Sequence, residues 1–117
     1  MSRIDELALR IKKFADDRDW DQFHSPKNLS MALSVEAAEL LEHFQWLTEE
    51  QSRNLPADKL SEVEEEIADV FNYLVRLADM LDIDLLAAAH RKIEINETKY
   101  PVAKARGNAT KYTRFDE

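Results

Sequence analysis

The sequence predicts an all-α protein built as a four-helix bundle, and three observations support that fold class. Apolar residues recur at intervals of three and four along most of the 117 residues, which is the spacing of one helix face. Strand-like alternation of apolar and polar residues is absent. The only glycine is Gly107, and three prolines, Pro26, Pro56 and Pro101, divide the chain into helix-length segments. Short connections between such segments are typical of a compact bundle.

The first half of the sequence predicts two helices separated by a loop. The first helix is expected from about Ser2 to Asp17, with Ser2 as its N-cap. Its apolar stripe consists of Ile4, Leu7, Ile11 and Phe14. Residues 18–25 are rich in aromatic side chains and are expected to form a loop. The second helix is expected from Pro26, which suits a first helical turn, to about Leu47.

The second half predicts two more helices and an irregular tail. A third helix is expected after Pro56, with Asp58 in its first turn, and should end near Leu81. A fourth is expected from about Asp84 to Thr98, where Pro101 prevents its continuation. Residues 102–117 are basic and polar and are expected to be irregular.

The third helix is apolar over more than one side, which predicts burial on several sides. The expected core stripe is Leu60, Val63, Ile67, Val70, Leu74, Leu77 and Leu81. A second stripe consists of Ala68, Phe71, Val75 and Ala78. A subunit contact would bury the second stripe, so we expect a homo-oligomer, either a dimer or a tetramer.

Composition and charge limit the possible functions. The length fits one domain over residues 1–117. A net charge of −8 argues against a nucleic-acid-binding protein, because such proteins need a basic face. The longest apolar run, Leu85 to Ala89, is too short for a membrane span. Cysteines and a recognisable signal peptide are absent, so we expect a cytoplasmic protein without a membrane partner.

Four carboxylates on two predicted helices form the main candidate site. Glu36 and Glu39 have i, i+3 spacing on the second helix, and Glu66 and Asp69 have the same spacing on the third. Glu36 interrupts an apolar stripe, and a charge on a core-facing line is costly without compensation. A hard divalent cation such as Mg²⁺ would resolve the repulsion, because it prefers oxygen ligands.

From the residues alone, an ordinary solvated acidic face remains equally open. We prefer that interpretation for Glu62, Glu64 and Glu65. A ferritin-like di-iron site would need Glu-x-x-His on facing helices. His43 is four residues from Glu39, and His90 has no glutamate three positions before it, so a di-iron site is disfavoured.

The spacing of these carboxylates, together with other segments, resembles a known family. Glu36-x-x-Glu39 followed by Glu66-x-x-Asp69 is similar to the magnesium motif of the all-alpha nucleotide pyrophosphohydrolases of the MazG type. Further segments resemble the dCTP pyrophosphatase branch: Arg18 to His24, Pro26, Asn28-Leu29, Phe44-Gln45-Trp46, Asp69 to Tyr73, Ile95-Asn96, Tyr100-Pro101 and Lys111-Tyr112-Thr113. The resemblance extends from about Asp16 to Thr113.

The resemblance implies a dimer or dimer of dimers that hydrolyses a (deoxy)nucleoside triphosphate, such as dCTP, to a monophosphate and pyrophosphate. It implies that Mg²⁺ is held by Glu36, Glu39, Glu66 and Asp69. Trp20 and Trp46 would form walls of the base pocket, and Tyr73, Lys92 and Asn96 would contact sugar or phosphate. Either Glu36 or Glu39 would also orient or deprotonate the attacking water. Ile11 stands where the dCTP branch has a base-contacting histidine, so the preferred base remains open.

Two other functions are compatible with the sequence. One is a helical nucleotide sensor that binds without hydrolysis, and the other is a non-catalytic oligomerisation module. The module would leave Glu36 on its apolar stripe unexplained. For the loop aromatics, stacking on a base is favoured for Trp20. Packing is favoured for Phe23, and His24 is interpreted as an ordinary loop histidine.

Overall fold

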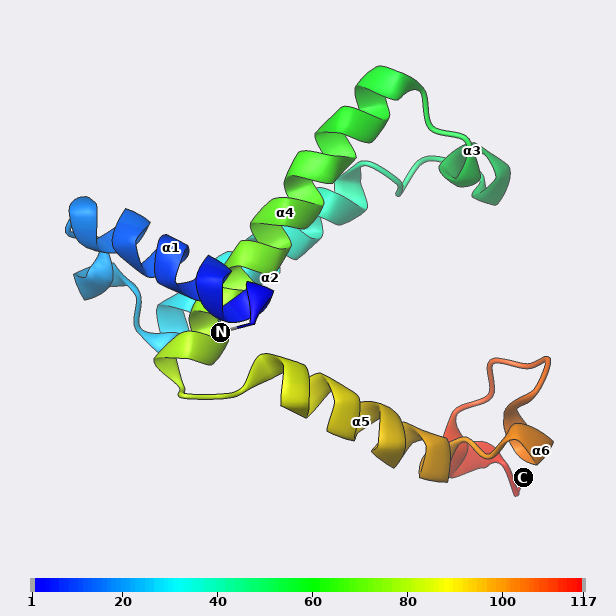
Figure 1. The fold of residues 1–117 in the computed structure, drawn as a ribbon. Coiled ribbons are helices and arrows are strands. Elements are labelled where there is room, and N and C mark those ends of the chain that lie inside the picture. Colours follow the sequence, from blue (N-terminus) through cyan, green and yellow to red (C-terminus); the bar gives the residue numbers. More distant parts are fainter. Residues whose placement is uncertain (1, 117) are drawn as a thin grey trace. The chain divides into compact units, whose positions relative to one another are not determined.

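The computed structural model describes residues 2–116, and every regular element in that range is helical (Figure 1). The long helices are α1 (Arg3–Asp17), α2 (Pro26–Glu42), α4 (Ala57–Met80) and α5 (Leu85–Lys99). The short elements are α3 (Glu49–Arg53), α6 (Val102–Ala105) and the 3-10 turns η1 (Asp21–Phe23) and η2 (Tyr112–Arg114). The all-α prediction is therefore confirmed.

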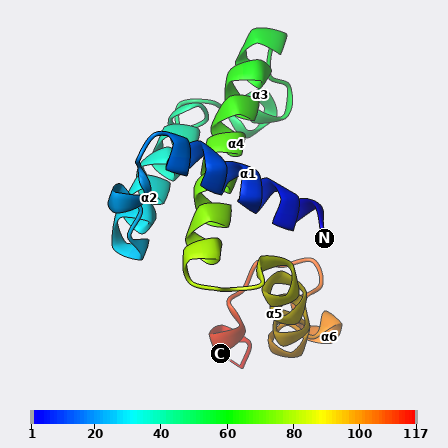
Figure 2. The same ribbon diagram turned by 60° about the vertical axis from the view of Figure 1, so that its left-hand side comes forward.

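The chain divides after Ile83 into two compact units. In the first unit, α2 and α4 lie side by side in opposite directions, and α1 crosses α4 (Figures 1 and 2). The reversal between α2 and α4 includes the short helix α3. Because α5 belongs to the second unit, the four-helix bundle and the single domain over residues 1–117 stay predictions.

Side-chain caps explain where several helices begin. Ser2 accepts a hydrogen bond from the Asp5 backbone N–H, and the Ser2 backbone N–H donates to the Asp5 carboxylate. Ser25 accepts from the Asn28 N–H at the start of α2, where Pro26 occupies the first turn. Asp84 caps α5 in the same way. Each cap satisfies a backbone N–H that has no partner within its helix.

Helices α1 and α4 end in the same backbone motif. Asp19 and Asp82 both have a φ of 53°, in the left-handed region. The N–H of Trp20 donates to the Ala15 carbonyl at 2.9 Å, and that of Ile83 donates to the Ala78 carbonyl at 2.9 Å. These are Schellman motifs, in which an aspartate occupies a position usually held by glycine. The motif after α1 fixes where the loop that carries Trp20 begins.

The buried apolar residues of the first unit correct the predicted faces of α4. The core consists of Ala15, Leu29, Val63, Val75 and Ala78. Val75, which is 2% exposed, and Ala78 were expected at a subunit contact but are buried within the chain itself. Conversely, Leu60 and Ile67 of the predicted core stripe are 54% and 52% exposed. Val63 of the predicted core stripe is buried as expected, so the buried apolar residues of α4 come from both predicted stripes. Periodicity could not tell which part of each stripe α1 and α2 cover.

Two boundaries also differ from expectation. Helix α2 ends at Glu42, and residues 43–47 form turns instead of the predicted last helical turn. The unpredicted helix α3 begins with a capping box, in which Thr48 and Gln51 exchange side-chain and backbone hydrogen bonds. This local motif favours a helix even in a polar segment that lacks an apolar stripe.

The second unit contains α5 and the C-terminal segment. Tyr100 packs edge-to-face against Tyr112 and against Phe115, with ring centroids 5.6 Å apart in each case. The Lys99 ammonium lies over the Tyr112 ring, 4.8 Å from its centroid. The tail that was expected to be irregular therefore contains α6 and η2, and aromatic contacts hold it against the end of α5.

Within residues 2–116, none of the helices combines the length and the apolar character that crossing a bilayer requires.

Candidate metal and nucleotide site

Three glutamates converge where α2 and α4 lie side by side. Glu36 and Glu39 project from adjacent turns of α2, and Glu66 faces them from α4. One carboxylate oxygen from each residue lies within 4.8 Å of the other two. Of the residues that the structure describes, these three form the one group of acidic or histidine side chains with this geometry.

The electrostatics of this cluster are unusual for glutamates. Glu36 Oε2 and Glu66 Oε1 are buried and have no hydrogen-bond partner among residues 2–116. The pKa of Glu36 is raised from 4.5 to about 8. The largest cause is the neighbouring Glu66 carboxylate, because two carboxyl groups this close can share a hydrogen bond only when one of them carries a proton; burial and the neighbouring Glu39 follow. Without a counter-charge, the cluster therefore retains a proton at neutral pH.

The donor set fits a hard divalent cation. All three side chains offer carboxylate oxygens, which are the ligands that Mg²⁺ prefers. A cation between them would also satisfy the two buried oxygens that lack a partner. Asp69 follows Glu66 by one turn of α4 but is not part of the three-carboxylate group. Its assignment as a ligand stays a prediction.

A cavity of about 470 Å³ lies between α1, the following loop and α4. Its walls include Asp69, Tyr73 and Trp20, and Ile11 contributes an apolar side chain from α1. A smaller cavity of about 260 Å³ shares Trp20, Tyr73 and His24 with it and extends toward Leu29 on α2. The structure thus brings three of the predicted site residues, Trp20, Asp69 and Tyr73, to one cavity.

Trp20 is held at the mouth of this cavity by other rings. It packs edge-to-face against Phe14, with centroids 5.5 Å apart, and against His24 at 6.4 Å. Its side chain nevertheless remains 43% exposed. An aromatic ring that is supported at its edges and open on part of its surface can stack on a nucleobase.

A larger cavity, about 560 Å³, is lined by Asp5, Lys12, Arg76 and Asp79, among others, and by no aromatic side chain. It includes neither Asp69 nor Tyr73 and has nothing on which a base could stack. The cavity with Trp20 and Tyr73 is therefore the better candidate for a nucleotide, although it is smaller.

The remaining predicted residues are not brought to this cavity. Trp46 lies in the turn after α2, is 87% exposed, and lines neither of the two cavities that Trp20 shares. Lys92 and Asn96 lie one turn apart on α5, in the second unit. The roles of these three residues stay predictions.

Sequence analysis overlooked Arg76, which lines the same cavity and contacts His24 and Asp21. It also treated His24 as an ordinary loop residue. One signal was available: Arg76 interrupts the apolar segment from Leu74 to Ala78. Its partners lie more than fifty positions earlier in the chain, so no local pattern could identify them.

Curated relatives share most of this sequence. The mouse protein dCTP pyrophosphatase 1 is 45% identical over 112 residues, which cover 94% of this chain and 66% of the mouse protein. Human dCTP pyrophosphatase 1 is 42% identical over 114 residues, covering 96% of this chain and 67% of the human protein. The chain thus spans about two thirds of the length of these relatives.

A solved structure is similar to this chain over most of the length of both proteins. The crystal structure of a pyrophosphatase from Archaeoglobus fulgidus superposes with a TM-score of 0.81 and 43% sequence identity, covering 86% of this chain and 94% of that one. Residues 31–115, which include all four predicted carboxylate ligands, match the MazG-like family. The chain therefore belongs to the MazG-like family.

Proposed function

We infer that this protein hydrolyses a (deoxy)nucleoside triphosphate to the monophosphate and pyrophosphate, and that a pyrimidine deoxynucleotide such as dCTP is the preferred substrate. The observation that carries this function is the group of three carboxylates, with two unpartnered buried oxygens, contributed by α2 and by α4, the helix that also lines the Trp20 cavity. The names of the mouse and human relatives and of the archaeal structure agree with it. A role in cleaning the cytoplasmic nucleotide pool would follow.

Mg²⁺ is the proposed cofactor. Glu36, Glu39 and Glu66 would hold it, and Asp69, one turn further along α4, would complete the site from the side of the cavity. When bound, the ion would neutralise phosphate charge and polarise the phosphorus centre. The raised pKa of Glu36 supports this assignment, because a cation would replace the proton that the cluster otherwise retains.

The carboxylates of the cluster differ in their exposure to solvent, and this difference suggests which of them activates the attacking water. Glu39 is exposed to solvent, so it can orient a water molecule and accept its proton as that water attacks phosphorus. Glu36 is partly buried and belongs to the same group, so it is the second candidate for this role. The bond between the α- and β-phosphates then breaks, and monophosphate and pyrophosphate are released.

The base would stack on Trp20, with Tyr73 beside it and Ile11 forming an apolar floor. Lys92 and Asn96 are proposed contacts to phosphate or sugar, and Trp46 is a proposed further wall of the base pocket. The high exposure of Trp46 supports a contact outside its own chain, either with substrate or with a second subunit.

We also propose assembly as a dimer or tetramer through α4. Exposed apolar side chains recur every seven residues along this helix and directly after it, and so form one apolar line: Leu60, Ile67, Leu74 and Leu81. Such a line on a small protein is typical of a subunit contact. Light scattering that found a monomer at micromolar concentration would contradict this assembly.

A product assay tests the function directly. The protein is incubated with a panel of ribonucleoside and deoxyribonucleoside triphosphates and Mg²⁺, and products are separated by chromatography. We expect monophosphate and pyrophosphate, and none when EDTA replaces Mg²⁺. Diphosphate and orthophosphate would show that a different bond is cut. Tight binding without any product would favour the nucleotide sensor.

A further inference from the structure

Arg76 is the buried charged side chain of residues 2–116, and its burial needs an explanation. It lies on α4 one turn after Tyr73 and is only 2% exposed. Withdrawing a guanidinium from water is costly, and a buried ion pair often contributes less stability than apolar side chains of the same size. Stability alone is therefore a weak reason for an arginine here.

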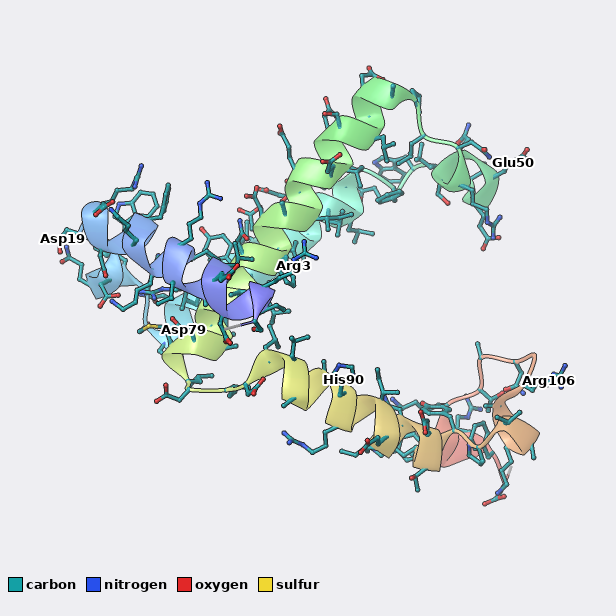
Figure 3. All side chains as sticks on the ribbon, viewed as in Figure 1. Arg3, Asp19, Glu50, Asp79, His90 and Arg106 are labelled. Atoms are coloured by element: carbon teal, nitrogen blue, oxygen red, sulfur yellow. The ribbon has the colours of Figure 1, made fainter. Side chains whose placement is uncertain are left out.

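All three arms of this guanidinium are engaged within the first unit. Nε donates to His24 Nδ1 at 3.2 Å, and one terminal nitrogen pairs with the Asp21 carboxylate. The other terminal nitrogen lies 3.7 Å from a carboxylate oxygen of Asp79, near the end of α4 (Figure 3). These contacts lie within the chain itself, so Arg76 can act on the loop without binding a phosphate group.

Two of these partners bracket a single turn of the loop between α1 and α2. Asp21 is the first residue of η1, and His24 directly follows it. The His24 N–H donates to the Asp21 carbonyl at 3.1 Å. Trp20 is the residue directly before this turn, and its carbonyl accepts from the Phe23 N–H at 2.8 Å. Arg76 thus holds both ends of the turn to which Trp20 is attached.

The same residues line the candidate nucleotide cavity. Arg76, His24 and Trp20 all contribute to its wall, together with Tyr73. The His24 ring also packs against the indole of Trp20. The position of Trp20 in the cavity therefore depends on the turn that Arg76 holds.

We propose that Arg76 is a positioning residue, which fixes the loop between α1 and α2 so that Trp20 forms one wall of the nucleotide cavity. This inference rests on the proposed function. Arg76 need not touch the substrate. It organises the stacking surface before the substrate arrives, so that less conformational freedom is lost on binding.

The test uses fluorescence and affinity together. The chain contains two tryptophans, so Trp46→Phe leaves Trp20 as the only one, and this variant serves as the reference. Arg76→Met is added to it, because methionine fills a similar space without charge and is expected to preserve folding. Asp21→Asn provides a second variant at a partly exposed position, and Asp79→Asn is the matched control, since Asp79 lies outside the loop.

We expect Arg76→Met to move the emission of Trp20 to longer wavelength, as the indole becomes more hydrated. The Kd for the nucleotide, from calorimetry, and KM should rise about five- to tenfold, with kcat changed less than about twofold, because only part of the stacking is lost. Asp21→Asn should act in the same direction, and Arg76→Lys should recover part of the affinity. Asp79→Asn should change neither emission nor Kd.

Unchanged Kd and KM in Arg76→Met would overturn the inference, whether or not the emission moves. A fall in kcat alone would also overturn it, because it would place Arg76 in the chemical step. If the parent protein, with Trp46 in place, hydrolyses no nucleotide, the proposed function fails. The emission of Trp20 then still decides whether Arg76 positions the loop, because that measurement needs no turnover.

Discussion

Two charged centres to which α4 contributes differ in how their charges are compensated. The cluster of Glu36, Glu39 and Glu66 brings like charges together and leaves two buried oxygens without a partner. Arg76 is more deeply buried, yet opposite charges or an imidazole nitrogen engage each of its arms. The first centre is incomplete without a ligand, whereas the second is complete as it stands. We therefore expect ligand binding to change the protonation and contacts of the cluster. Binding should depend on the contacts of Arg76 but should not change them.

The largest expected effect is on catalysis when the cluster loses one ligand. Glu66→Gln should lower kcat/KM at least about a hundredfold, because a metal contributes several kcal/mol to the transition state. In EDTA the same variant should be at least as stable as the parent, since an amide can donate to the Glu36 carboxylate. Steady-state assays and thermal melts with EDTA and with Mg²⁺ check both points.

Glu64→Gln is the matched control for this change. Glu64 is exposed on the same helix, and its substitution removes the same charge as Glu66→Gln. Glu64→Gln should therefore leave activity and the Mg²⁺-dependent rise in Tm intact. Asp69→Asn should reduce that rise if Asp69 is a ligand. An undiminished rise would leave Asp69 as a wall of the cavity only.

The next effect compares the two tryptophans. Trp20→Ala should weaken nucleotide binding by about 1–3 kcal/mol, because Trp20 lines the cavity and can stack on the base. Trp46→Ala should have a smaller effect, because Trp46 lines neither of the cavities that Trp20 shares. Calorimetric titration with several nucleotides gives both values and the ranking of bases. A larger loss for Trp46→Ala would indicate a pocket completed by a second subunit.

A moderate effect should appear in the pH dependence of the metal-free protein. The pKa of Glu36 is raised from 4.5 to about 8 in the folded state, so the folded chain binds more protons than the unfolded chain between about pH 4.5 and pH 8. The Tm in EDTA should therefore fall as the pH rises from about 4.5 to about 8 and level off above that, and the Mg²⁺-dependent increase in Tm should grow over the same range. Glu36→Gln should abolish this pH dependence, and a flat parent profile would contradict the assignment.

The smallest expected effect belongs to the Arg76 centre. Burial, followed by the charge of Arg76, lowers the pKa of His24, although Asp21 opposes this. The unfolded chain therefore binds the extra proton more readily, and stability should decline as the pH falls below the ordinary histidine pKa of about 6.5. NMR titration of the His24 ring gives its pKa, and Arg76→Met should raise that value. An unchanged pKa would mean that Arg76 does not act on this ring.

Local features explain why the helices could be predicted well. The ends of α1, α4 and α5 lie within about two residues of expectation, because caps and prolines act over one helical turn. The three clustered glutamates were also predictable, since their i, i+3 spacing and the apolar neighbours of Glu36 are visible in the sequence.

Features that depend on packing partners were not predictable. The apolar sides of α4 were assigned incorrectly for Val75 and Ala78, because both sides have helical periodicity and only the docking of α1 and α2 distinguishes them. Arg76 was missed because a single arginine on a helix is normally a surface residue. Its role depends on Asp21 and His24, which the fold brings near from a distant loop.

The Schellman motifs at Asp19 and Asp82 also constrain how this sequence can vary in evolution. Only glycine, asparagine and aspartate adopt the left-handed conformation at little cost. In a homologue with valine or isoleucine at position 19, the chain must leave α1 along a different path, so the stacking ring would have a different orientation. The residue at position 19 therefore separates two groups of relatives. Where it is glycine, asparagine or aspartate, the geometry of the Trp20 loop can be transferred. Where it is β-branched, the base preference must be measured anew.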